Sequence, residues 1–221
     1  MGPAFDFAWI ADHTGQIFSK LIEHLELTFL AVGIGFLIAL PLGILAFRHR
    51  RLYPPITWIT GTLYTIPSLA FFVLLIPSLG LTIANIEVAL VSYTLLILIR
   101  NIVTGLDGVS EDAKDAARGM GLTDRQILWR VEIPLALPVI VAGIRIATVT
   151  TIGLVTVSSL LGYGGLGYFI LNGFQNFFAT PLVLGAVLSA LLAVVLDALL
   201  LQMEKLMSPW RRASTVEVAT T

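Results

Sequence analysis

Five long apolar segments constrain this chain more than any other feature of its sequence. Each is close to the roughly 20 apolar residues that an α-helix needs to cross the hydrocarbon core of a bilayer. Only 12% of the residues are charged, which is about half the fraction found in an average soluble domain. The pattern predicts an all-α integral membrane protein with about five transmembrane helices, at about 24–47, 56–79, 83–104, 136–161 and 180–204.

The positions of lysine and arginine indicate which side of the membrane each connection faces. Basic residues are concentrated in cytoplasmic loops. We therefore expect the N-terminus outside, the C-terminus in the cytoplasm, and the segments 80–82 and 162–179 on the outer side. The basic clusters that carry this prediction are Arg48, Arg50 and Arg51, then Arg100, Lys114, Arg118, Arg125 and Arg130, and finally Lys205, Arg211 and Arg212.

The chain reads as one transmembrane domain, 23–207, with a short segment at each end. Residues 1–22 lack the basic start of a cleavable signal peptide, so they are either an interfacial segment on the outer surface or a loosely ordered leader. Residues 208–221 are expected to form a disordered cytoplasmic tail.

Disulfides, metal sites and nucleic acid binding find no support in the composition. Cysteine is absent and the three histidines are scattered, so we expect neither a disulfide nor a metal site. The net charge of −1 gives no reason to expect a nucleic acid partner.

The cytoplasmic loop 105–135 is more structured than a plain connection requires. Ser110 is placed to cap a helix with acidic residues in its first turn, and Gly119 and Gly121 supply the backbone that ends it. Residues 123–126 form a capping box that opens a second short helix, which Pro134 is expected to end.

Small side chains on the first of these loop helices suggest a docking surface. Ala113, Ala116 and Ala117 are expected on or near one face, where another protein can approach the backbone closely. The alternative is an amphipathic loop that lies on the inner leaflet.

The loop resembles the signature of the permease subunits of bacterial ABC importers, which is Glu-Ala-Ala, three residues, Gly, nine residues and Ile-x-Leu-Pro. Here the matching residues are Asp115-Ala116-Ala117, Gly121 and Val131-Glu132-Ile133-Pro134. In that family the loop forms a coupling helix that sits in a groove of a cytoplasmic ATPase subunit. The resemblance implies ATPase coupling by Asp115, Ala116, Ala117, Gly119, Gly121 and Pro134.

Other segments resemble the branch of the family that imports glycine betaine, carnitine and choline. They are Thr65–Ala70, Ala117–Gly121, Pro134–Pro138, Ala142–Arg145 and Gly162–Gly167. The resemblance implies a plasma (inner) membrane permease that pairs with itself or with a related chain and receives an osmoprotectant from an extracytoplasmic binding protein. An ABC permease for another solute, such as an amino acid, is the alternative.

ATP hydrolysis is expected in a separate chain. No G-x-x-x-x-G-K-[ST] motif occurs, so this chain is expected to bind no cofactor and to be no enzyme, while ATP and Mg²⁺ act in the partner ATPase. A secondary transporter or channel is a less favoured alternative, because five spans do not divide into equal inverted halves.

A glycine-rich segment, Gly162, Gly164, Gly165 and Gly167, matches G-x-G-x-x-G. That motif binds dinucleotides only between a β-strand and a helix, whereas here it links two membrane spans. We interpret it as a site of close packing or an external gate.

Charged and helix-breaking residues inside the spans suggest further sites. Arg145 and Asp197 lie at similar depth, so they are expected to form an ion pair, the alternative being a snorkelling Arg145 and a protonated Asp197. Pro67 breaks the second span, where Thr65 or Ser68 can satisfy freed backbone groups. Together with Tyr64 these residues are candidates for the translocation pathway, the alternative being a simple packing kink.

Overall fold

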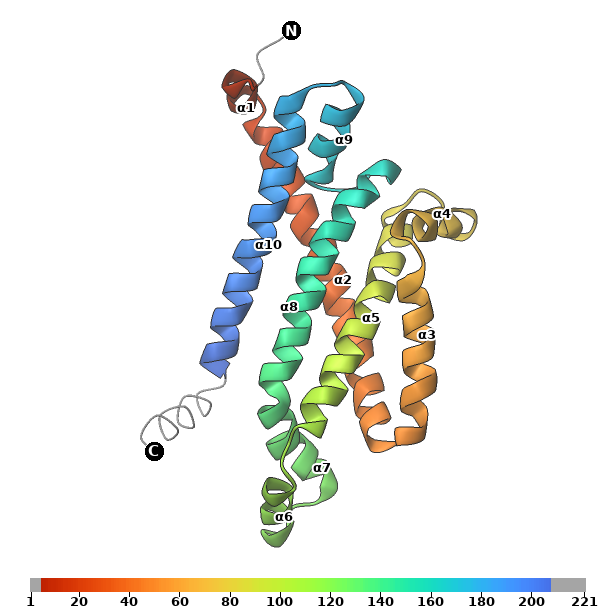
Figure 1. Ribbon diagram of the computed structural model, residues 1–221, viewed down its shortest axis with the longest axis vertical. Helices are drawn as coiled ribbons and strands as arrows, with labels where there is room; N and C mark the ends of the chain where they lie inside the picture. Colours follow the sequence, from red (N-terminus) through yellow and green to blue (C-terminus); the bar gives the residue numbers. More distant parts are fainter. Residues whose placement is uncertain (1–4, 208–221) are drawn as a thin grey trace.

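The computed structural model describes residues 5–207, and every regular element within that range is a helix. Long helices run along the molecule, α1, α4 and α9 lie at one end, and α6 and α7 lie at the other (Figure 1). The α-helices are α1 Phe7–Asp12, α2 Thr14–Arg48, α3 Tyr53–Thr65, α4 Ser68–Leu79, α5 Ile83–Asp107, α6 Glu111–Gly119, α7 Asp124–Ile127, α8 Ile133–Ser158, α9 Gly167–Gln175 and α10 Ala179–Met207. Three short turns of 3-10 or π geometry complete them, η1 Arg50–Leu52, η2 Leu128–Glu132 and η3 Ser159–Leu161.

Four helices of the described chain are long and apolar enough to cross a membrane: α2, α5, the continuous helix Asp124–Leu161 that contains α8, and α10. The segment predicted at 56–79 is instead two helices, α3 and α4, bent by 98°. Pro67 disfavours helical backbone at the residue before it, and Ile66 accordingly has extended backbone with ψ 127°. As a result α4 turns across the end of the bundle (Figure 1).

Helix α5 is the centre of the bundle, packed between α2 and α8. Two glycines of α2 allow this close approach, since a Cβ on Gly43 would lie 2.6 Å from Cγ2 of Ile102 and one on Gly35 would overlap the side chain of Thr94. Small residues at such seams let membrane helices pack closely. The large apolar side chains of α5 that are fully buried are Ile86, Leu90, Leu98, Ile99, Ile102 and Leu106.

Within the segment 1–22, which is expected to be interfacial or a loosely ordered leader, residues 7–12 and 14–22 are helical. Helix α2 begins at Thr14, so residues 14–22 are the start of the same helix that contains the first span. The preceding helix α1 is capped by Asp6, whose carboxylate accepts hydrogen bonds from two backbone N–H groups at 2.9 and 3.2 Å. The backbone N–H of Asp6 donates to Thr180 Oγ1 at 2.8 Å, which ties α1 to the start of α10.

The connection between the last two spans contains a helix, α9, that the sequence analysis did not predict. Helix α9 packs along α10, where Gly185 lets the backbone of α9 approach, because a Cβ there would lie 3.0 Å from the backbone nitrogen of Ile170. The predicted tail at 208–221 lies outside the described residues.

Candidate coupling site and transport pathway

Helix α6 projects from one end of the bundle and has a well-formed start (Figure 1). The Ser110 side chain accepts a hydrogen bond from the backbone N–H of Ala113 at 3.4 Å, and Glu111 and Asp112 occupy the first turn. Acidic side chains there interact favourably with the helix dipole. The predicted cap and helix start are therefore confirmed.

The outer face of α6 carries only part of the predicted coupling set. Asp115, Ala116 and Gly119 are exposed, whereas Ala117 is 1% exposed and packs against the protein. Adjacent residues of a helix differ by about 100° in direction, so Ala116 is exposed while Ala117 faces the protein, and Ala113 is half-buried. Of the three alanines expected on one docking surface, only Ala116 is fully open to a partner.

Gly121 provides the turn that ends α6. Its backbone has φ 82°, its N–H donates to the carbonyl of Arg118 at 2.9 Å, and the N–H of Leu122 donates to the carbonyl of Ala117 at 3.2 Å. These two bonds define a Schellman motif with glycine in the left-handed position. Gly119 is the last helical residue, so of the two predicted glycines only Gly121 is needed for the change of direction.

Replacing Gly121 with alanine is expected to loosen the end of α6. A side chain in the left-handed region costs roughly 1–2 kcal/mol, which lowers the free energy of local opening by a similar amount. Hydrogen–deuterium exchange of the α6 amides measures this change. Gly121→Asn is the control, because asparagine tolerates this backbone conformation, and equal exchange in Gly121→Ala and the parent would contradict the prediction.

The second loop helix does not end at Pro134, which corrects the sequence-based expectation. The capping box is present, with the N–H of Thr123 donating to Gln126 Oε1 at 2.8 Å. From Asp124 the helix continues without a break to Leu161. A π turn at η2, directly before Pro134, changes the hydrogen-bond spacing at the point where proline lacks an N–H. The loop is thus rigidly joined to α8.

Buried charges anchor α6 to the body of the protein. Lys114 Nζ lies 2.9 Å from Glu111 Oε1 and 3.8 Å from Glu132 Oε1, and its side chain is only 9% exposed. The same ammonium group lies 5.7 Å from the ring centroid of Phe47 at the end of α2. In the sequence, Lys114 indicates only which side of the membrane the loop faces. Its role in anchoring α6 was not predicted.

Two arginines join the α2–α3 corner to the loop. Arg48 Nη2 donates to the backbone carbonyl of Asp124 at 3.1 Å, and Arg50 makes a bidentate pair with Asp107, with Nη1 2.9 Å from Oδ2. The Asp107 carboxylate raises the pKa of Arg50 above its ordinary value. Arg48 therefore connects α7 to the end of α2, whereas Arg50 connects η1 to the end of α5.

The glycine-rich segment packs against α2 at the opposite end of the molecule. The N–H groups of Gly164 and Gly165 both donate to Glu23 Oε1, at 3.0 and 3.1 Å. The N–H of Leu166 donates to Nδ1 of the buried His24 at 3.2 Å. Side chains at Gly164, Gly165 and Gly167 would collide with backbone atoms, so close packing explains these three glycines.

The nucleotide-binding interpretation of this motif fails, because η3 precedes it instead of a strand. Gly162 has φ 94° and ends η3 in the left-handed region. Glu23 and His24 were missed from the sequence, where they read as the polar start of a span.

The break at Pro67 is held by Tyr93 of α5. Its hydroxyl donates to the carbonyl of Ile66 at 2.6 Å, while the hydroxyl of Thr65 satisfies the carbonyl of Thr62 at 2.7 Å. Tyr64 lies edge-on to Tyr93 with ring centroids 5.9 Å apart. The expected help from Thr65 is present, whereas the larger contribution of Tyr93 was not predicted.

Replacing Tyr93 with phenylalanine is expected to destabilise the α3–α4 bend. The carbonyl of Ile66 would lose its donor at a site with little access to water, at a cost of about 1–3 kcal/mol. Unfolding of the purified protein in mixed micelles measures this loss. Tyr64→Phe is the matched control, because no hydrogen bond from its hydroxyl occurs within the described chain, and an equal effect of both substitutions would refute the role of Tyr93.

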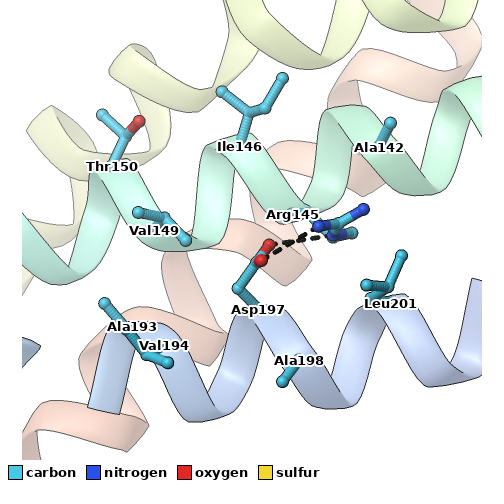
Figure 2. Close-up of a pocket in the computed structure, with 10 residues that line it drawn as sticks. All are labelled: Ala142, Arg145, Ile146, Val149, Thr150, Ala193, Val194, Asp197, Ala198 and Leu201. Carbon is cyan, nitrogen blue, oxygen red and sulfur yellow. Dashed lines mark hydrogen bonds and ion pairs between the residues drawn. The ribbon is translucent and has the colours of Figure 1, made fainter. Parts of the chain in front are cut away.

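Arg145 and Asp197 lie face to face across α8 and α10, as Figure 2 shows. Arg145 Nε lies 2.9 Å from Oδ1 and Nη2 lies 3.0 Å from Oδ2, which is a bidentate pair. Glu204 adds a second carboxylate, 3.3 Å from Nη1. The ion pair borders a groove of about 660 Å³ between the two helices. Glu204 was missed, although its position seven residues after Asp197 places both on one helix face.

This bundle, with its rigid helical projection at one end, has the fold of an ABC importer membrane subunit. It is similar to a chain of the inward-facing MetNI methionine ABC transporter, with a TM-score of 0.78 at 24% identity over 87% of this chain and 96% of that chain. Residues 31–209 match the family described as binding-protein-dependent transport system inner membrane component. The chain belongs to this family and is a multi-pass inner-membrane transport subunit.

Several relatives are similar over most of their length. The osmoprotectant import permease protein OsmW of Salmonella typhimurium is 41% identical over 91% of this chain and 96% of its own. The choline transport system permease protein OpuBB of Bacillus subtilis is 37% identical over 88% and 90%. The glycine betaine/carnitine/choline permease protein OpuCB of Bacillus subtilis is 35% identical over the same shares. The predicted fold class and the family resemblance are confirmed.

Proposed function

We propose that this chain forms the membrane pathway of an ATP-driven importer for glycine betaine, choline, carnitine or a related quaternary amine. The observation that carries the proposal is the similarity of nearly the whole chain to permeases named for osmoprotectants, choline and glycine betaine. The alternative of amino-acid import has only the fold of the methionine transporter in its favour.

Helix α6 is the element proposed to receive force from a cytoplasmic ATPase. Its outer face presents Asp115, Ala116 and Gly119, and these short or absent side chains let a groove of the ATPase approach the helix backbone. ATP and Mg²⁺ act in that partner, and this chain supplies no nucleotide-binding motif. The coupling end of the bundle therefore faces the cytoplasm.

The anchors of the loop suggest how movement spreads. A displacement of α6 and α7 is passed to α8 through the unbroken helix from Asp124. It also reaches α2 through Arg48, which donates to the carbonyl of Asp124. Since α3 ends at the Pro67 bend, we propose that Tyr64, Thr65, Pro67 and Ser68 border the pathway and that the glycine-rich segment 162–167 belongs to the outer gate.

The rest of the assembly follows from the same proposal. A second permease, either another copy or a related chain, completes the pathway. A separate binding protein delivers the solute at the end of the molecule where α4 and α9 lie (Figure 1). Substrate choice then depends largely on that binding protein.

Uptake into proteoliposomes tests the proposal. The permease, its ATPase and its binding protein are expected to accumulate radiolabelled glycine betaine, choline or carnitine only with ATP, and to leave methionine outside. Accumulation driven by an ion gradient without ATP would indicate a secondary transporter. Import of methionine alone would favour the amino-acid alternative.

A further inference from the structure

A groove of about 430 Å³ lies between the coupling-side end of α2 and the α7–η2 region. It is separate from the Arg145 groove and from the exposed face of α6. One part of its lining is apolar and includes Leu45, Leu128 and Trp129, and the other part is basic, formed by Arg48, His49 and Arg125. Among the described residues that line it, none is acidic. The groove is therefore amphipathic, with a positive end.

The basic end has unused hydrogen-bonding capacity. Within residues 5–207, neither Arg48 nor Arg125 has a carboxylate within ion-pair distance. A guanidinium has five N–H donors. Arg48 donates one hydrogen bond to the carbonyl of Asp124 at 3.1 Å, so further donors remain for a ligand. Both arginines are exposed. An anion with several acceptor oxygens fits this end, and phosphate is a group that arginine binds in bidentate form.

The apolar end lies at the depth of the membrane interface. Leu45 is in the last turn of the apolar run of α2, directly before Arg48 and His49. Trp129 is 53% exposed although it belongs to a membrane-entering helix, and exposed tryptophans of membrane proteins gather at the headgroup level. The groove thus changes from apolar to basic along the direction in which a lipid changes from acyl chain to headgroup.

We propose that this groove binds an anionic phospholipid of the leaflet on the coupling side. Its phosphate lies between Arg48 and Arg125, and an acyl chain runs along Leu45 and Trp129. Basic pockets at the cytoplasmic ends of membrane helices bind anionic headgroups in this way. Because Arg48 also holds the Asp124 carbonyl, the bound lipid sits at the joint between α2 and the coupling loop.

Fluorescence quenching by brominated lipids tests this site. The chain has four tryptophans, so Trp9→Phe, Trp58→Phe and Trp210→Phe leave Trp129 as the reporter in the full-length protein. Dibrominated phosphatidylglycerol is expected to bind at Trp129 with a constant roughly fivefold or more above that of dibrominated phosphatidylcholine. Adding Arg48→Gln and Arg125→Gln should bring this ratio close to one.

Arg51→Gln with Arg130→Gln is the matched control, because it removes the same charge from two exposed arginines outside the groove. It should keep the preference for phosphatidylglycerol. Equal quenching by the two lipids in the parent protein would overturn the proposal, whatever the stability of the variants. An equal loss of the lipid preference in the control pair would also overturn it. Protection of Trp129 from both lipids when the ATPase is added would overturn it too, because the groove would then be a protein-docking surface.

Discussion

Replacing Arg145 with glutamine lowers the free energy of unfolding by about 2–4 kcal/mol, the largest loss of stability that we expect from one polar substitution. The arginine makes the bidentate contact with Asp197 and also lies 3.3 Å from Glu204. Without it, the Asp197 carboxylate loses that partner at the edge of a largely apolar groove. Unfolding in mixed micelles, followed by tryptophan fluorescence, measures the change.

Ranking the variants by their loss of stability distinguishes a specific ion network from a general effect of removing polar side chains. Asp197→Asn and Glu204→Gln should each cost less than Arg145→Gln, since one carboxylate still pairs with the guanidinium. The double variant Arg145→Gln with Asp197→Asn should recover most of the stability, because neither half of that bidentate pair is then left without the other. Arg130→Gln, an exposed arginine without an ion pair in the described chain, should change little. Equal costs for Arg145→Gln and Asp197→Asn would contradict this account.

Features governed by residues near in sequence were predictable. The Ser110 cap, the 123–126 capping box and the break at Pro67 each depend on a few neighbouring residues. The same holds for the membrane spans, because an apolar run of sufficient length has few alternatives to a buried helix. The Arg145–Asp197 geometry was also expected, since charges at equal depth in adjacent helices stabilise each other.

Apart from the Arg145–Asp197 pair, contacts between distant segments were not predictable. Glu23 meets Gly164 and Gly165 across 141 and 142 residues of sequence, and no local pattern points to that contact. The inward orientation of Ala117 is set by Lys114 and by the end of α2, neither of which the alanine pattern reveals. The continuation of the helix through Pro134 depends on the π turn before it, which a general rule for proline omits.

Replacing Ala116 with arginine should lower ATP-driven uptake by roughly tenfold or more, which corresponds to at least 1.4 kcal/mol of lost coupling or docking. Ala116 lies on the exposed face of α6, so a long side chain there would separate the proposed ATPase groove from the helix backbone. Stability of the isolated permease should remain unchanged, because the new side chain extends into solvent. Uptake, ATP hydrolysis and unfolding are measured on the same preparation.

Two neighbouring substitutions separate docking from folding. Ala116→Ser adds one small atom and should preserve uptake, whereas Ala117→Arg should lose both uptake and stability, because Ala117 is 1% exposed. Burying an unpaired charge there is destabilising in itself. If Ala116→Arg transports normally, or if it loses stability as Ala117→Arg does, the outer face of α6 does not dock an ATPase as proposed. Loss of uptake with retained stability at Ala116 alone supports α6 as the force-receiving surface, because that substitution changes the exposed face of the helix and leaves its packing unchanged.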